Sequence, residues 1–465
     1  MAQSKIPALR PSDGGGHNFV CYADCCSGVP GAPHEENFAA VNAVVARLEP
    51  PPDFICFPGD EVVGLTASDE ELRRQWRHWF EHEMAWLDRK RIPLYHTTGN
   101  HTAYDPASEA VFREVMAHLP DNGPAGQGRL SYAVRRGDLL MAFVNTTWSG
   151  LGGEGRVETE WLDRTLAENS DARFKLVFGH HPVHPVNGFS GTRQREIDHD
   201  DGRELWRILV NHGVLAYVCS HILAFDVQVH SGVLQILTAG AGTVPRMPEG
   251  VEYLHCVQAA LDQDGLRYQV LDTTGAVREE LAWPLRLPPA EEWKPFEPED
   301  TSTDSGSGPA GDDAKARITT WRFRGHSASG TDGTPQTLLF APSPGSALAP
   351  LWLGLRGAEQ RLTVLLSARP GTSPHTWLGP ELPPDEPFDF QLAIHDGMGP
   401  GGLLHREDDA AAWSSLRAAS SWGAERLPRP TRWTIGHGQR GPSDQPFRGR
   451  KLRVAGQSSH AAVLS

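Results

Sequence analysis

Five apolar runs, each followed by a short polar segment, most constrain what this chain can fold into. The runs are rich in β-branched and aromatic residues, which is typical of buried strands. The polar segments are Asp24-Cys25-Cys26, Gly59-Asp60-Glu61, Gly99-Asn100-His101, Gly179-His180-His181-Pro182 and Ser220-His221-Ile222-Leu223. Side chains at the C-terminal ends of neighbouring strands can converge on one point. Carboxylates, an amide and imidazoles gathered in this way predict a site for a divalent metal ion.

The order of these segments resembles the calcineurin-like metallophosphoesterase superfamily over about residues 17–275. That family's pattern is Asp-x-His, then Gly-Asp, then Gly-Asn-His-Asp/Glu, then a His before a Pro, then Gly-His-x-His. Any one of these motifs is weak evidence, but five in the right order, each behind a strand, are specific. The resemblance implies an α/β fold, a four-layer α/β/β/α metallophosphoesterase-like sandwich.

The resemblance also implies two adjacent metal sites that share one carboxylate. Asp60 matches the bridging carboxylate, and the remaining ligands of one site match Asn100, His180 and His221. Asp24 matches the carboxylate of the other site. One site therefore has its full set of ligands in this sequence.

The other site departs from the family pattern at two positions. Cys26 stands where the first motif has an imidazole, and Leu223 stands where the last motif has one. Leucine cannot bind a metal ion, and cysteine does so only as a thiolate, which prefers softer ions. We therefore expect about one tightly bound divalent ion per chain, Mn, Fe or Zn, with weak occupancy on the Asp24 side.

The candidate catalytic residues are His101, Asp24 and Cys26. His101 matches the imidazole that the family places beside the leaving-group oxygen. The carboxylate that follows it in the family is replaced by Thr102, and a hydroxyl orients an imidazole more weakly than a carboxylate does. His101 remains a candidate general acid or an electrostatic clamp on the substrate.

Several nearby residues are candidates to complete the altered site. They are His34 in the loop after the first motif, His184 and His199 in the loop after the fourth, and also Cys25 and His17. A single histidine in a loop is more commonly solvated or hydrogen-bonded than bound to a metal. Since two nitrogen ligands are missing, full repair requires two such replacements.

Three functions remain open at this stage. The leading hypothesis is a metal-dependent hydrolase of a phosphate ester. The alternative is a diverged member that uses a single metal as a Lewis acid on another bond, with Cys25 or Cys26 taking part. The third is a non-catalytic binding protein with a relict site. Retention of His101 argues against the third hypothesis, whereas the replacements at Cys26 and Leu223 argue for it.

Composition favours a soluble enzyme with a small anionic substrate. The chain has 465 residues, is 39% hydrophobic and carries a formal net charge of −15, which disfavours nucleic acids and anionic membranes as partners. No apolar run approaches the about 20 residues that span a bilayer, and the first residues lack the apolar core of a signal peptide. Six cysteines without a regular C-x-x-C pair predict a reducing, cytoplasmic setting.

The pattern along the chain predicts four parts, with a composition change near residue 284. We expect a tail at 1–16, the catalytic domain at 17–283, a Pro-rich and acidic linker at 284–316 and an all-β sandwich-like domain at 317–465. This last domain can bind a sugar, pack against the hydrolase or form a homo-oligomer.

Within the catalytic domain a long helix is predicted over 68–90, with Ser68 as its cap and Glu71 completing a capping box. Its tryptophans Trp76 and Trp79 recur at helical spacing. A Trp-rich stripe of this kind is typical of a hydrophobic core; the alternative makes one of the two a wall of the substrate pocket.

Overall fold

The computed structural model divides the chain into two compact units, which are described separately. One unit comprises Met1–Val227 with Gly232–Pro284, and the other Gln228–Ser231 with Leu285–Ser465. The structure describes residues 4–12, 15–186, 196–245, 252–285, 294–295, 317–329, 332–341, 351–366, 375–395, 398–407, 411–420, 434–438 and 444–460. Most of the expected linker at 284–316 therefore lies outside the described residues.

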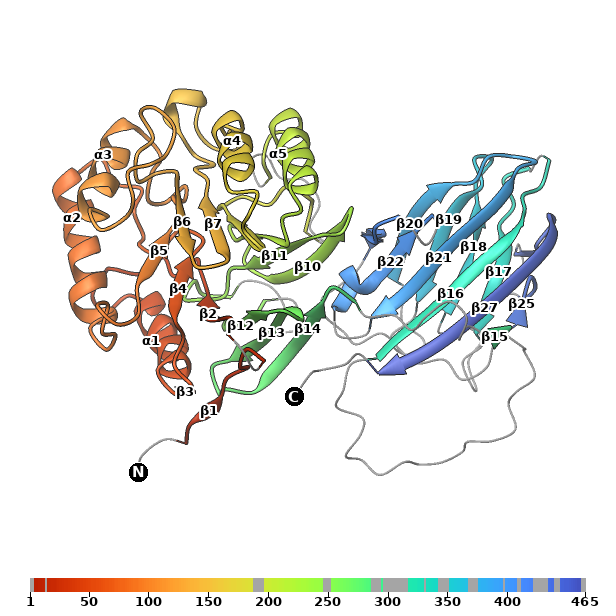
Figure 1. Cartoon of the computed structure of the whole chain (residues 1–465), viewed down its shortest axis with the longest axis horizontal. Coiled ribbons are helices and arrows are strands. Elements are labelled where there is room, and N and C mark those ends of the chain that lie inside the picture. Colours follow the sequence, from red (N-terminus) through yellow and green to blue (C-terminus); the bar gives the residue numbers. More distant parts are fainter. Residues whose placement is uncertain are drawn as a thin grey trace. The chain divides into compact units, whose positions relative to one another are not determined.

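The described part of the first unit contains two six-stranded sheets (Figure 1). One sheet has the order β14-β13-β12-β2-β4-β5 and the other β10-β11-β9-β8-β7-β6. The first consists of β2 (His17–Cys21), β4 (Phe54–Phe57), β5 (Leu94–His96), β12 (His255–Asp262), β13 (Gly265–Asp272) and β14 (Val277–Trp283). The second consists of β6 (Tyr132–Arg136), β7 (Leu139–Phe143), β8 (Phe174–Phe178), β9 (Ala216–Cys219), β10 (Phe225–His230) and β11 (Val233–Thr238).

The strands that precede the five polar segments run in parallel sets. β2, β4 and β5 pair in parallel within the first sheet, and β8 and β9 pair in parallel within the second. The C-terminal ends of the strands in each set therefore lie at one edge of their sheet. The sequence-based expectation that the polar segments follow strands is confirmed for all five.

Helices cover the outer faces of the two sheets (Figure 1). They are α1 (Pro33–Val45), α2 (Asp69–His78), α3 (Pro106–Val115), α4 (Glu160–Glu168) and α5 (His199–Asn211), with a π-helical turn η1 (Trp79–Glu83) after α2 and a 3-10 turn η2 (Ser149–Leu151). α1 packs on β12 and β13, whereas the apolar sides of α4 and α5 join one core cluster with β7, β8, β9 and β11. The Tyr95 and Phe143 rings, 5.7 Å apart, connect β5 and β7 between the sheets. The predicted four-layer α/β/β/α sandwich is confirmed.

The helix predicted over 68–90 begins where expected but ends early. The Ser68 hydroxyl accepts a hydrogen bond from the Glu71 N–H at 3.2 Å, so this residue caps α2 as expected. The chain then leaves α-helical geometry at Trp79 and forms the π-helical turn. That turn lets Trp76 and Trp79 both become fully buried, and the Trp79 ring lies 5.1 Å from Phe57 of β4. The interpretation of the tryptophans as core residues is confirmed, and neither forms a pocket wall.

The N-terminal segment contributes a short strand to the first unit. Residues 1–16 were expected to form a tail, but β1 (Ile6–Pro7) pairs in parallel with β3 (Leu48–Glu49).

Within the described residues, no helix combines the length and the apolarity that crossing a lipid bilayer requires.

The second unit is strand-rich, as predicted for residues 317–465. Its described strands form two sheets, with orders β15-β27-β16-β21-β22-β23 and β24-β20-β19-β18-β17-β25. The main strands are β16 (Arg317–His326), β17 (Gln336–Ala341), β18 (Leu351–Arg356), β19 (Arg361–Leu366), β20 (His375–Glu381), β21 (Pro387–His395), β22 (Leu403–Arg406) and β27 (Arg450–His460). The others are β15 (Lys294–Pro295), β23 (Ser414–Ser415), β24 (Arg417–Ser420), β25 (Thr434–Ile435) and β26 (Gln445–Pro446), which pairs with β17. Side chains from both sheets share one apolar cluster, which makes this unit a β-sandwich.

Candidate metal centre

Tight turns at strand ends bring the polar segments together. Asp24, Asp60 and His221 have left-handed backbone conformations, with φ of 57°, 56° and 70°. Non-glycine residues seldom adopt this region, and when they do they cluster at functional sites. Each turn reverses the chain just beyond its strand, so that the side chain faces the neighbouring strand ends.

Four side-chain atoms converge at one point. Asn100 Oδ1 lies 3.1 Å from His180 Nε2 and 3.0 Å from His221 Nδ1. The two imidazole nitrogens are 3.1 Å apart, and Asp60 Oδ2 lies 3.2 Å from His180 Nε2. The structure thus brings together the four residues that the sequence assigns to the complete site.

These separations fit a metal ion. Ligand atoms about 2.1 Å from a zinc-like ion are spaced about 3.0–3.4 Å from each other in octahedral or tetrahedral geometry. The donor set of two imidazoles, one amide oxygen and one carboxylate suits Mn, Fe or Zn. The residues present therefore match the requirements of a divalent ion without rearrangement.

The support behind His180 fixes the orientation of its ring. Nδ1 donates to the Pro58 carbonyl at 2.9 Å, and the Ser220 hydroxyl lies 2.9 Å from Nδ1 while donating to the same carbonyl at 2.6 Å. With Nδ1 protonated, Nε2 presents its lone pair to the site. Burial alone would raise the pKa of the Asp60 carboxyl, but His180 and the His101 N–H hold that pKa well below its usual range.

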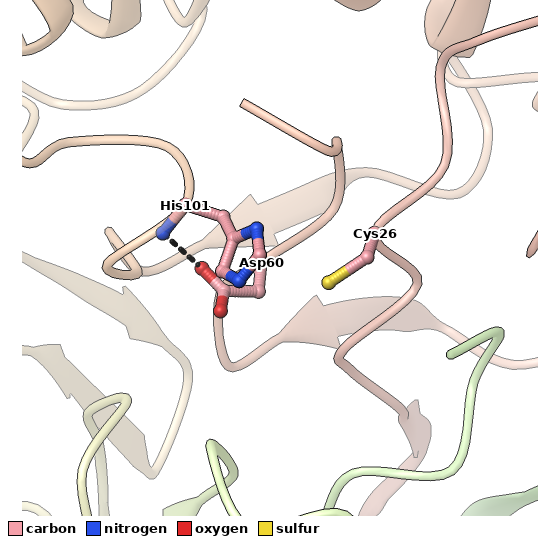
Figure 2. A group of neighbouring side chains, drawn as sticks. All are labelled: Cys26, Asp60 and His101. Carbon is pink, nitrogen blue, oxygen red and sulfur yellow. Dashed lines mark hydrogen bonds between the residues drawn. The ribbon is translucent and has the colours of Figure 1, made fainter. Parts of the chain in front are cut away.

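On the Asp24 side the arrangement is different. Asp24 Oδ2 accepts a hydrogen bond from the His221 N–H at 3.0 Å, and burial raises the pKa of its carboxyl to about 7. Figure 2 shows the Cys26 sulfur facing the Asp60 carboxylate and His101, and possible ligand atoms of these three residues lie within 4.8 Å of one another. Leu223 packs against the apolar cluster under α4 and α5. This side therefore keeps a carboxylate and a thiol but has no imidazole at either family position.

His101 is oriented by the backbone and not by Thr102, which stands where the family has a carboxylate. Nδ1 donates to the Val63 carbonyl at 2.7 Å, and the backbone N–H donates to Asp60 Oδ1 at 2.9 Å. The Thr102 hydroxyl instead bonds within its own turn, accepting from the Gly99 N–H at 2.9 Å. Gly99 and Thr102 are three positions apart in the chain. The threonine hydroxyl therefore closes this turn and does not contact the His101 ring. With Nδ1 engaged, Nε2 of His101 is the ring atom left for chemistry.

The residues proposed to repair the altered site have other contacts. His34 donates from Nδ1 to the Cys26 carbonyl at 2.8 Å, and His17 pairs with Asp138 at 3.0 Å. The His184 ring packs on Trp206 at 4.4 Å, while His199 is exposed at the start of α5. In the part of the chain that the structure describes, neither these histidines nor Cys25 belong to a group of possible metal ligands.

Two residues that the sequence analysis missed lie beside His221. Glu154 Oε1 is 3.2 Å from His181 Nε2 and 3.6 Å from His221 Nε2. The His180-His181 pair in the fourth segment was a visible signal that a second imidazole lies near the site. Glu154, in a glycine-rich loop after η2, had no such signal.

Comparisons with known proteins found one matching family model and several similar proteins. Residues 17–225 match the family model for calcineurin-like phosphoesterases. Tartrate-resistant acid phosphatase type 5 of Oryctolagus cuniculus is 25% identical over 265 residues, which cover 52% of this chain and 75% of that enzyme. The fold is also similar to a purple acid phosphatase, PPD1, from yellow lupin (13% identity, TM-score 0.43, 59% of this chain and 55% of that one). A third similar structure is GAP50, the anchor in the inner membrane complex of Plasmodium (14% identity, TM-score 0.40, 57% of this chain and 88% of that one).

Proposed function

We propose that the chain, whose residues 17–225 match the family model for calcineurin-like phosphoesterases, hydrolyses a phosphate ester with a single, tightly held metal ion at its complete site. The observation that carries this proposal is the convergence of Asn100 Oδ1, His180 Nε2 and His221 Nδ1, at separations of 3.0 and 3.1 Å, beside Asp60. Burying four converging polar side chains without an ion is costly, and this cost supports a bound metal at the site.

The four ligands hold the ion from the ends of four strands. When bound, the ion polarises a phosphoryl oxygen and makes water a better nucleophile at neutral pH. His180 is held by Pro58 and Ser220, so its Nε2 stays directed at the ion. Asp60 contributes its charge in a water-poor setting, where electrostatic interactions are strong.

His101 acts on the leaving group in this proposal. Its Nδ1 is engaged by the Val63 carbonyl, so a proton carried on Nε2 can pass to the ester oxygen as the bond to phosphorus breaks. The hydrogen bond from its backbone N–H to Asp60 ties the position of this ring to the metal site. Asp24, which receives the His221 N–H, acts by fixing the turn that carries His221.

The alternative, in which a cysteine takes part in a non-phosphoester reaction, has weaker support. Cys25 and Cys26 are buried, and burial raises the pKa of both thiols well above the ordinary value. A thiol that resists ionisation is a poor nucleophile and a poor ligand.

We also propose a reducing, cytoplasmic setting. The six cysteines are unpaired, and Cys21 and Cys56 remain thiols although they face each other in register on β2 and β4. The strongly negative net charge supports a small anionic substrate, bound at the metal, in preference to nucleic acid. A homo-oligomer formed through the β-sandwich remains part of this proposal.

The test combines metal analysis with turnover on an aryl phosphate monoester and diester. We expect a tightly held ion on the complete site together with hydrolysis that EDTA abolishes and metal restores. A bound ion without phosphoester turnover would favour the Lewis-acid alternative. A chain that binds no metal would favour the relict binding protein.

A further inference from the structure

A second group of possible ligands lies on the opposite side of the His221 ring from the first. Its members are Glu154 Oε1, His181 Nε2 and His221 Nε2, and all three atoms lie within 4.8 Å of one another. The His181 and His221 rings are 4.3 Å apart between centroids. The function proposed above uses Nδ1 of His221 but neither its Nε2 nor the other two residues.

Hydrogen bonding explains only part of this arrangement. The 3.2 Å contact between Glu154 and His181 is a normal hydrogen bond, whereas the 3.6 Å distance from Glu154 to His221 Nε2 is too long for one. These two distances bracket the about 3.4 Å between ligands of a tetrahedral zinc ion with bonds of about 2.1 Å. Both distances are compatible with ligands around one ion.

Both new residues are held in place by their own surroundings. The His181 ring contacts Thr146 Oγ1 through Nδ1 at 2.8 Å, and it is fully buried. Glu154 lies between Gly153 and Gly155, whose φ values of 90° and 82° permit a tight loop. The Gly155 N–H donates to the Thr146 carbonyl at 2.9 Å, so the same residue positions His181 and the loop with Glu154.

We propose that Glu154, His181 and Nε2 of His221 form a second cation site, displaced to the far side of His221 from the altered one. Two imidazole nitrogens and one carboxylate are the donor set of catalytic zinc sites, which keep a position open. The side chain of Glu154 is 27% exposed, so an ion can reach this site from solvent. A borderline ion such as Zn²⁺ or Co²⁺ is the fitting occupant.

His221 bridges the two ions in this arrangement. On binding, the proton on His221 Nε2 passes to solvent, and the proton that His181 Nε2 shares with Glu154 is exchanged for one on Nδ1, which then donates to Thr146 Oγ1. Each Nε2 lone pair then forms a bond to the second ion. Because only three protein ligands are present, the second ion is held more weakly than the first. The inference rests on the proposed function in one respect, since it takes His221 Nδ1 to hold the first ion.

The experiment measures metal stoichiometry of the full chain. Metal-free protein is dialysed against a series of buffered free Zn²⁺ concentrations, and bound zinc is counted by elemental analysis. We expect one ion at low free zinc and two at higher free zinc for the parent chain. Glu154→Ala and the size-preserving Glu154→Gln should lose the weaker ion and keep the tight one. Glu160→Ala, which removes an exposed carboxylate of α4 nearby in the sequence, should still bind two.

Cobalt identifies where the second ion sits. Co²⁺ bound to Cys26 would give an intense thiolate charge-transfer band, whereas Co²⁺ on Glu154 and His181 would not. A parent chain that never binds more than one ion would overturn the second site and leave the proposed function intact. Two ions that persist in both Glu154 variants, or a second ion that brings a thiolate band lost in Cys26→Ser, would equally overturn it. A parent chain that binds no ion even at the tight site would instead contradict the proposed function.

Discussion

On both sides of Asp60 the polar segments follow parallel strands, but the side chains of the two sides make different contacts. On one side, Asn100, His180 and His221 point potential ligand atoms at each other at separations of 3.0–3.1 Å. On the other, the Asp24 carboxylate binds a backbone N–H and Leu223 joins an apolar cluster. The same kind of strand-end turn therefore carries converging candidate ligands on one side of Asp60 and structural contacts on the other.

The turn after β9 carries one residue of each side, His221 of the complete side and Leu223 of the altered side. Its left-handed residue, His221, places the ring on the complete side while its N–H is held by Asp24. Two residues later the chain carries Leu223, which faces the core of the unit. A ligand on the Asp24 side would require this apolar contact to be given up, so the two uses of position 223 exclude each other.

Removal of a ligand from the complete side should have the largest effect. His221→Ala deletes one of the converging atoms, so we expect loss of the tight ion. Phosphoesterase activity should fall by more than about 10²-fold, which is the largest loss expected when only a residue that supports a metal ligand is removed. Asp60→Asn should act in the same way. Elemental analysis and turnover check both. His199→Ala, which removes an exposed imidazole, is the control, and retention of the tight ion in His221→Ala would contradict the assignment.

His101→Ala should separate chemistry from metal binding. The contact with Asp60 comes from the backbone N–H, which alanine keeps, so the ion should remain. Turnover should fall by about 10²-fold or more if the ring serves as general acid. The measurements are kcat and bound metal on the same preparation. Full activity in this variant would remove His101 from the mechanism.

Restoring the family's nitrogens tests whether the altered side limits the activity. The double change Cys26→His with Leu223→His should let the chain bind one ion more than the parent and raise activity on phosphate monoesters or diesters, because a further ion shares charge in the transition state. Stability should fall, since Leu223 leaves its apolar contacts. Loss of the native activity in this variant would point to another reaction.

The support behind the ligands should matter less than the ligands. Ser220→Ala removes a hydroxyl that lies 2.9 Å from His180 Nδ1, but leaves the Pro58 carbonyl to orient the ring. We expect metal affinity at the complete site to fall by about tenfold, measured by competition with a chelator. Ser170→Ala, at an exposed turn, is the matched control, and an unchanged affinity in Ser220→Ala would mean that Pro58 alone is sufficient.

Cys26→Ser should have the smallest effect of the series. The change conserves size and removes the thiol, and Cys26 has no role in the proposed mechanism. Activity should stay within about twofold of the parent, a difference below about 0.5 kcal/mol. A large loss would revive a role for the thiol and favour the Lewis-acid alternative.

The sequence alone predicted the fold of the first unit and the convergence of the candidate ligands of the complete site. Each of Asp60, Asn100, His180 and His221 follows a strand-like run, and parallel strands end at one edge of a sheet. A local pattern plus that topological rule is therefore enough to predict their convergence. The β-sandwich was predicted from a different signal, the short strand-like runs that Gly and Pro turns separate after residue 316.

Only the tertiary structure decided the partners of these residues. The Val63 carbonyl orients His101 in place of Thr102, α2 gives way to a π-helical turn at Trp79, and Leu223 turns to the core. Glu154 reaches His181 and His221 from a loop between β7 and α4. These contacts join segments far apart in the chain through backbone groups and loop turns, and no short-range spacing of residue types encodes them.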